Sequence, residues 1–109
     1  MSEIKQITET ILKFRDERDW EQFHNSKDLA VAISIEASEL LELYLWRENE
    51  AADPEKLKEE LADVLTFSFL LAEKHGMDIK EIIEQKVTQN AEKYPVDKAK
   101  GTAKKYSEL

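Results

Sequence analysis

The sequence predicts an all-α fold, a four-helix bundle formed by a single domain that spans residues 1–109. A chain of 109 residues has room for one hydrophobic core. Two glycines and two prolines leave little material for a sheet with many turns. Apolar residues recur at helical spacing in four segments, and polar stretches separate these segments. We therefore expect four helices that pack as a bundle.

The first helix is predicted from apolar residues three and four positions apart, which form one stripe from Ile4 to Phe14. We expect this helix to end near Arg18. Residues 19–25 mix aromatic and polar side chains without a period, so they are predicted to form a loop or a short turn.

The second helix is predicted to run from about Ser26 to Trp46. Its apolar residues point in nearly every direction, and a helix that is apolar all round is expected to be surrounded. Glu36 and Glu39 interrupt this pattern. On a helical wheel of about 100° per residue with Ile33 at zero, Glu36 projects at ~300° and Glu39 at ~240°, and both lie between apolar neighbours.

The third helix is predicted to begin at Asp53–Pro54, an N-cap followed by the first helical residue, and to run to about Lys74 before Gly76. Glu60 and Asp63 repeat on this helix the spacing and the wheel position of the two acids on the second helix. We call the four acids together the acid quartet: Glu36, Glu39, Glu60 and Asp63.

The fourth helix is predicted from Asp78 and Glu81, which have the spacing of a capping box, to a point before Pro95. Residues 95–109 are polar and rich in lysine. We expect them to form a mobile tail unless a ligand or a partner holds them.

The acid quartet predicts a metal site. An ionised carboxylate in apolar surroundings must be protonated, paired with a base or bound to a metal ion. Lys56 lies one turn ahead of Glu60 and can pair with that acid, whereas residues 29–46 of the second helix contain no Lys or Arg. Four carboxylates from two facing helices suit Mg²⁺, with Mn²⁺ as the alternative, because these hard cations prefer oxygen ligands.

Two other interpretations of the acids fit the sequence less well. A single acidic pair on a helix is usually part of a solvated face, but two pairs at matching wheel positions favour a ligand. A di-iron bundle requires two Glu-x-x-His pairs, and this chain has a single one, Glu21 with His24, in the aperiodic stretch. The sequence contains no P-loop, GxGxxG or GxSxG motif, and the absence of cysteine excludes thiol nucleophiles.

Composition restricts the location and the partners of the protein. A net charge of -8 argues against binding to nucleic-acid polymers or to anionic membranes. The N-terminus shows no basic patch followed by an apolar stretch, and no apolar run approaches the ~18 residues of a membrane span. We expect a cytoplasmic protein.

Several separated stretches resemble one family. They are EASE and EELAD with the acid quartet, RDWEQFH (residues 18–24), YLW ending at Trp46, KVTQNAEKYP (86–95) and the terminal KKYSEL. In this order they resemble the MazG-like all-α nucleotide pyrophosphohydrolases, and more narrowly the dCTP pyrophosphatase branch. The resemblance covers the chain from about Phe14 to the C-terminus.

The resemblance implies an enzyme that hydrolyses (deoxy)nucleoside triphosphates, dCTP or a modified dCTP among them, to the monophosphate and pyrophosphate with Mg²⁺. The acid quartet would supply the metal-binding and catalytic residues. Lys86, Asn90 and Tyr94 would contact the phosphates or the sugar, and Trp20 and Trp46 would flank the base.

Two positions depart from close relatives of that branch. Ile11 stands where they carry His, and Phe67 stands in the substrate site where they carry Tyr, so both changes remove polar contacts near the nucleotide. Because the second helix has no polar side, we expect a homodimer or a homotetramer with sites near subunit boundaries. The alternative function is a helical module that binds a nucleotide or a protein without catalysis.

Overall fold

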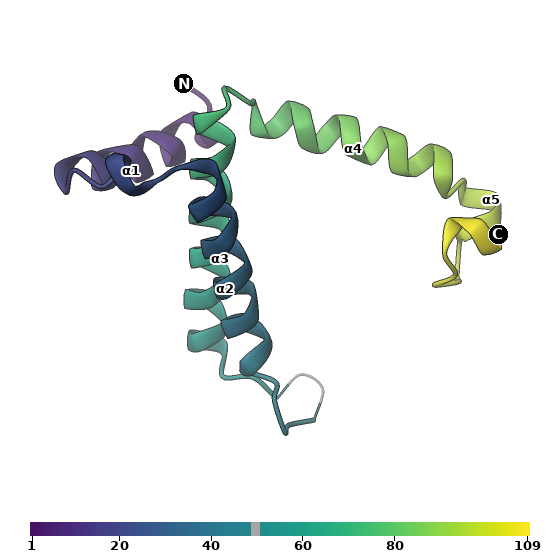
Figure 1. The fold of residues 1–109 in the computed structure, drawn as a ribbon. Coiled ribbons are helices and arrows are strands. Elements are labelled where there is room, and N and C mark those ends of the chain that lie inside the picture. The colour runs from purple at the N-terminus through teal and green to yellow at the C-terminus, as the bar shows by residue number, and fades with distance from the viewer. Residues whose placement is uncertain (49–50) are drawn as a thin grey trace. The chain divides into compact units, whose positions relative to one another are not determined.

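The computed structural model describes residues 1–48 and 51–109, and all of the regular secondary structure in these residues is helical (Figure 1). The elements are α1 Glu3–Glu17, η1 Glu21–Phe23, α2 Ser26–Glu42, α3 Pro54–Lys74, α4 Ile79–Lys93, α5 Val96–Ala99 and η2 Tyr106–Glu108, where η is a 3-10 turn. The all-α prediction is confirmed. The chain divides into two compact units, Met1–Gly76 and Met77–Leu109, and each is described by itself. Among the described residues, no helix combines the length and the apolar character needed to span a bilayer.

Side-chain caps explain where the four long helices begin. The side chains of Ser2, Asn25, Asp53 and Asp78 each accept a hydrogen bond from a backbone N–H in the first turn that follows. Such N-caps satisfy donors that have no partner inside the helix. The predicted starts of the second, third and fourth helices are confirmed. Gly76, with φ of +63°, takes the left-handed conformation that ends α3.

The second helix is shorter than predicted. α2 ends at Glu42 instead of Trp46, because residues 43–45 make backbone hydrogen bonds to the residue three positions earlier and so form a tighter turn. Trp46 then has φ of +62°, a left-handed conformation that is rare for a bulky side chain and that turns the chain away from the helix. Neither Gly nor Pro marks this end in the sequence.

The first unit is built on the pair α2 and α3, which lie side by side, with α1 against α3 (Figure 1). Leu29 of α2 and Leu70 of α3 are the most buried large side chains of its core, with exposed fractions of 2% and 5%. α3 covers one side of α2. Val31 and Ile35 remain exposed on α2.

The second unit consists of α4, α5 and η2. Tyr94, at the end of α4, contacts Tyr106 of η2 edge to face, with ring centroids 6.1 Å apart. The ammonium of Lys93 lies 5.1 Å from the centre of the same Tyr106 ring. Residues 95–109 therefore contain two short helical elements, and one of them contacts the end of α4.

Candidate metal and nucleotide site

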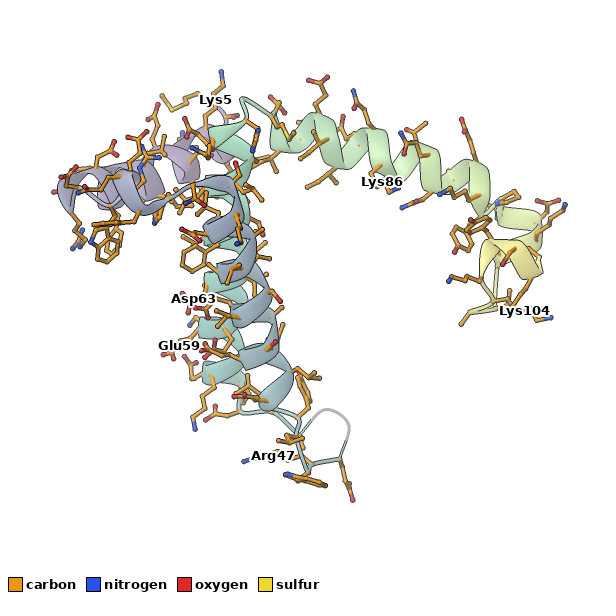
Figure 2. The ribbon with its side chains drawn as sticks, in the orientation of Figure 1. Lys5, Arg47, Glu59, Asp63, Lys86 and Lys104 are labelled. Carbon is orange, nitrogen blue, oxygen red and sulfur yellow. The ribbon has the colours of Figure 1, made fainter. Side chains whose placement is uncertain are left out.

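The structure brings three acids of the quartet together. Glu36 of α2 and Glu60 and Asp63 of α3 each present a carboxylate oxygen, and these oxygens lie within 4.8 Å of one another. Figure 2 shows Asp63 on α3. Spacing of three residues keeps both acids of a helix on one side, and the side-by-side packing of α2 and α3 makes the two sides meet. Glu39 is close enough to share a hydrogen bond with Glu36.

The acids raise each other's pKa values. The pKa of Glu36 rises from 4.5 to about 7, first because its side chain shares a hydrogen bond with Glu39, then because of desolvation and repulsion by neighbouring acids. Desolvation, followed by repulsion from Glu39, also raises the pKa of Glu60. In both cases the ionised form is disfavoured where several negative charges converge.

These acids fit a divalent cation. One oxygen each of Glu36 and Glu60 is buried without a hydrogen-bond partner among the described residues. A buried polar atom of this kind needs a partner, and a hard cation would satisfy it. The quartet consists only of oxygen donors, which suits Mg²⁺ or Mn²⁺ better than soft metals.

A cavity with aromatic walls opens beside Glu36 and Asp63. Its volume is about 370 Å³, within the range of about 300–1,000 Å³ that is usual for small-molecule sites. We call it the aromatic cavity. It is lined by Ile11, Phe14, Arg15, Trp20, His24, Glu36, Asp63, Thr66, Phe67 and Leu70. Trp20 and Phe67, both named from the resemblance, therefore share one cavity with two acids of the quartet.

Contacts between α1 and its neighbours hold Trp20 at this cavity. Asp19 takes a left-handed conformation with φ of 53°, and the N–H of Trp20 donates to the carbonyl oxygen of Arg15 at 3.1 Å. The Trp20 ring packs edge to face on Phe14, with ring centroids 5.7 Å apart. The guanidinium of Arg18 lies 3.7 Å from the centre of the Phe14 ring. The turn after α1 is thus a packed support for Trp20.

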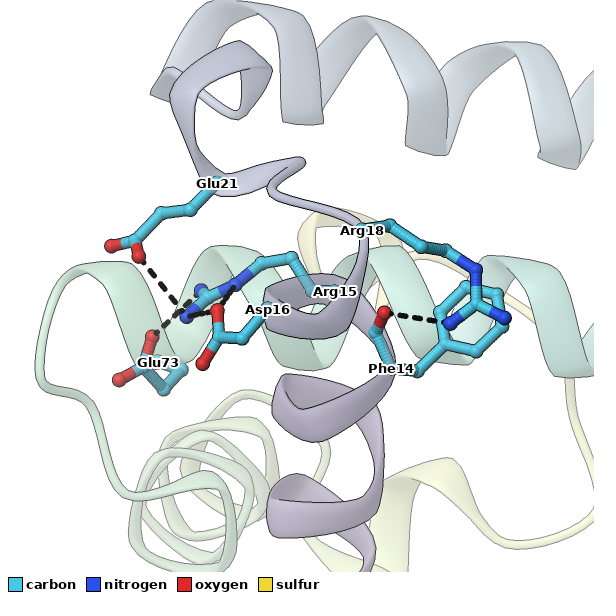
Figure 3. Close-up of polar contacts among 6 residues, drawn as sticks. All are labelled: Phe14, Arg15, Asp16, Arg18, Glu21 and Glu73. Atoms are coloured by element: carbon cyan, nitrogen blue, oxygen red, sulfur yellow. Dashed lines mark hydrogen bonds and ion pairs between the residues drawn. The ribbon is translucent and has the colours of Figure 1, made fainter.

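Arg15 connects this turn to α3. Its guanidinium forms ion pairs with Asp16 at 2.8 Å, Glu21 at 3.4 Å and Glu73 at 3.7 Å (Figure 3). The side chain of Arg15 is only 11% exposed. Because Glu21 belongs to η1 and Glu73 to α3, the arginine joins three elements at one wall of the aromatic cavity.

Sequence reasoning missed the placement of His24. Its Nδ1 atom is buried without a hydrogen-bond partner in the described residues, and its side chain lines the aromatic cavity. The available signal was its place four residues after Trp20 within RDWEQFH. From the sequence, His24 is predicted to be a polar loop residue, with contact to the substrate as the lesser alternative.

A second cavity lies where α2 ends and α3 begins. Its volume is about 620 Å³, and we call it the charged cavity. It is lined by Glu39, Glu42, Leu43, Arg47, Asp53, Lys56 and Glu60. The ion pair that the sequence allows between Lys56 and Glu60 is not among those formed by residues 1–48 and 51–109.

The other residues predicted to bind the substrate are not among the described residues that line the two cavities. Trp46 follows α2 with 94% of its surface exposed. Lys86 and Asn90 are exposed on α4, and Tyr94 is half-buried against Tyr106 in the second unit. Their roles in binding substrate stay predictions.

Comparisons with known proteins identify the family. The sequence profile of the MazG-like family matches residues 31–109. The chain is 34% identical to dCTP pyrophosphatase 1 of Mus musculus, over 97% of this chain and 67% of that protein. It is 33% identical to dCTP pyrophosphatase 1 of Homo sapiens over the same shares. The crystal structure of a pyrophosphatase from Archaeoglobus fulgidus is similar with a TM-score of 0.82 and 31% identity, over 87% of this chain and 94% of that one.

The comparisons and the quartet point to the same chemistry, since relatives over nearly the whole chain are pyrophosphatases and the acids converge beside a small-molecule cavity. The chain belongs to the MazG-like family, on the branch that includes the dCTP pyrophosphatases, and is an enzyme of the nucleoside triphosphate pyrophosphohydrolase type.

Proposed function

We propose that the protein hydrolyses deoxynucleoside triphosphates, with dCTP or a modified dCTP as preferred substrate, to the monophosphate and pyrophosphate, and that Mg²⁺ supports the reaction. The observation that carries this proposal is the convergence of Glu36, Glu60 and Asp63 at the edge of the aromatic cavity. The dCTP pyrophosphatases to which the chain is similar support the choice of base.

The acid quartet would hold the cation. Bound Mg²⁺ would neutralise the triphosphate and lower the pKa of a water molecule. In the reaction, the water oxygen bonds to the α-phosphorus, and the bond between that phosphorus and the α,β-bridging oxygen breaks. Pyrophosphate leaves with the electron pair, and a carboxylate of the quartet accepts the proton of the water. No protein nucleophile takes part.

The aromatic cavity would bind the base. Trp20 offers an aromatic face for stacking, and Phe67 offers a second apolar wall. His24, whose buried Nδ1 has no hydrogen-bond partner within residues 1–48 and 51–109, would hydrogen-bond a polar edge of the base. Ile11 adds an apolar contact.

Residues of α4 and other copies of the chain also have roles in this proposal. Lys86, Asn90 and Tyr94 lie at intervals of four residues on α4 or at its end, and we propose that they contact the phosphates or the sugar. Val31 and Ile35 form an exposed apolar strip on α2 that suits a homodimer or a homotetramer. The exposed Trp46 would then flank the base in the site of a neighbouring subunit.

The direct test is to incubate the protein with each deoxynucleoside triphosphate and Mg²⁺ and to measure pyrophosphate and orthophosphate separately. The proposal predicts pyrophosphate and the matching monophosphate, with dCTP or a modified dCTP turned over fastest, and no turnover after chelation of the metal. Release of orthophosphate would contradict the proposed cleavage site. Binding of nucleotides without turnover would contradict the enzymatic function and favour a binding module.

A further inference from the structure

The two cavities lie at opposite ends of the acid quartet. Glu39 and Glu60 line the charged cavity, whereas the other two acids of the quartet line the aromatic cavity. Along α3 the order is Lys56, then the two quartet acids of this helix, then Phe67. At a rise of 1.5 Å per residue, Lys56 and Phe67 are separated by roughly 16 Å along the helix axis. A nucleoside triphosphate has the same linear order of base, reacting α-phosphate and terminal phosphates.

The lining of the charged cavity suits phosphates and not a base. Among its lining residues in the described part of the chain, none is aromatic and Leu43 alone is apolar. A base needs a flat apolar or aromatic surface to stack on, whereas phosphate oxygens need cations and N–H donors. Two basic residues, Lys56 and Arg47, line this cavity. Figure 2 shows Arg47 beyond the end of α2.

Lys56 is available for such a ligand. It lies one turn ahead of Glu60, yet in the described residues the two form no ion pair. Lys58, two positions along, does pair with an acid, Glu55, at 3.5 Å. Arg47 donates through Nη1 to the carbonyl oxygen of Ala51 at 3.5 Å, and within residues 1–48 and 51–109 its guanidinium makes no other hydrogen bond or ion pair.

Four acids line the same cavity as the two basic residues, so a bare polyanion would be repelled. The occupant must therefore bring positive charge with it. We propose that the charged cavity is the subsite for the terminal pyrophosphate of the substrate as a divalent-cation complex, and that Lys56 and Arg47 recognise its oxygens. The inference rests on the proposed function, because it assigns the base and the terminal phosphates of the same substrate to the two cavities.

The test measures binding of inorganic pyrophosphate with Mg²⁺ by isothermal titration calorimetry, for the wild-type protein and for Lys56→Gln and Arg47→Gln. Charge-assisted hydrogen bonds are strong enough that we expect each variant to bind about tenfold more weakly. Lys58→Gln is the matched control, since it removes the same charge from the same helix outside the cavity, and it should bind as the wild type does. Circular dichroism checks that each variant is folded.

Kinetics separate the two ends of the substrate. The same variants should show a raised KM for the triphosphate, while the ratio of kcat/KM between two bases stays as in the wild type. Wild-type protein that does not bind pyrophosphate, a Lys56→Gln variant that binds it normally, or an equal loss in Lys58→Gln would overturn the subsite. If pyrophosphate binding depends on Lys56 but no triphosphate is hydrolysed, the subsite stands and the proposed function fails.

Discussion

The aromatic cavity and the charged cavity share the acid quartet but are built in different ways. The aromatic cavity, of about 370 Å³, is lined by the rings of Phe14, Trp20 and Phe67, and the ion pairs of Arg15 lie at its wall. The charged cavity, of about 620 Å³, is lined mainly by charged side chains where α2 ends and α3 begins, and Glu39 and Glu60 among them are half-buried. Aromatic rings discriminate between bases by shape, whereas the mixed charges of the other cavity suit a polyphosphate only as a complex with a divalent cation. We therefore expect selection of the base at one end and of the triphosphate at the other.

The largest expected effect comes from removing what the two cavities share. Glu60→Gln deletes one charge of the quartet, and we expect kcat/KM to fall by about 100-fold or more, the usual loss when a group that stabilises the reacting charges is removed. In metal-free buffer the variant should be as stable as the wild type or more stable, because a desolvated charge repelled by its neighbours has gone.

Steady-state kinetics and thermal unfolding with a chelator measure these two effects. Glu59→Gln is the control, because Glu59 is the exposed neighbour on α3 and lies outside the group of converging oxygens. Full turnover by Glu60→Gln would refute the assignment of the quartet as the metal site.

The second prediction separates the cavities. Trp20→Ala removes a stacking surface from the aromatic cavity, and we expect nucleotide binding to weaken about tenfold, since stacking of a base on an aromatic ring is worth about 1–3 kcal/mol. Binding of pyrophosphate should not change. Phe23→Ala is the control, because Phe23 lies three residues away, is 62% exposed and does not line the cavity.

Calorimetry with a non-hydrolysable nucleotide and with pyrophosphate distinguishes the two ligands. An equal loss for both ligands in Trp20→Ala would show that the cavities do not act separately. An equal loss of nucleotide binding in Phe23→Ala would remove Trp20 from its proposed role.

The two cavities also differ in how far sequence predicts them. The directions of Glu36 and Glu60 follow from regular helix geometry, so spacing alone placed them on facing sides. The resemblance named Trp20 and Phe67 as substrate residues, but it also named Trp46, which does not line the aromatic cavity. The burial of His24 Nδ1 depends on packing between distant segments.

The charged cavity was not predicted, because it depends on where α2 ends. Neither Gly nor Pro marks that end, and the left-handed conformation of Trp46 is unusual for its residue type. A helix continued to Trp46 would have carried the following Arg47 in another direction. Side-chain caps determine the helix starts, whereas the end of α2 depends on the tighter backbone turn at residues 43–45 and on the left-handed conformation of Trp46.

The third prediction concerns the effect of pH on the metal-free protein. The pKa of Glu36 is raised to about 7 in the folded state from about 4.5 in the unfolded chain. The protonated Glu36 contributes stability that is fully present below pH 4.5 and is lost as pH rises through 7. Above pH 7 the carboxylate is ionised in both states, but only in the folded state does it lie beside other acids that repel it. The midpoint of thermal unfolding with a chelator should fall between pH 5 and pH 8, and Mg²⁺ should raise it most at pH 8.

Glu36→Gln isolates this contribution from those of other groups. The variant should lose less stability over the same pH range than the wild type does, and it should gain less from Mg²⁺. Identical pH profiles for the variant and the wild type would show that Glu36 does not titrate in this interval.

The smallest effect is expected at the support of the aromatic cavity. Glu73→Gln removes one of the ion pairs of Arg15, at 3.7 Å, and the Glu73 side chain is 40% exposed, so water screens the pair. We expect a loss of about 0.2–1 kcal/mol in the free energy of unfolding, weaker at high salt, and a small rise in KM for the nucleotide. Glu55→Gln, which breaks the more exposed pair with Lys58, should change neither quantity. Denaturant unfolding at two salt concentrations tests this. If Glu73→Gln weakened pyrophosphate binding but not nucleotide binding, Arg15 would support the charged cavity and not the aromatic cavity.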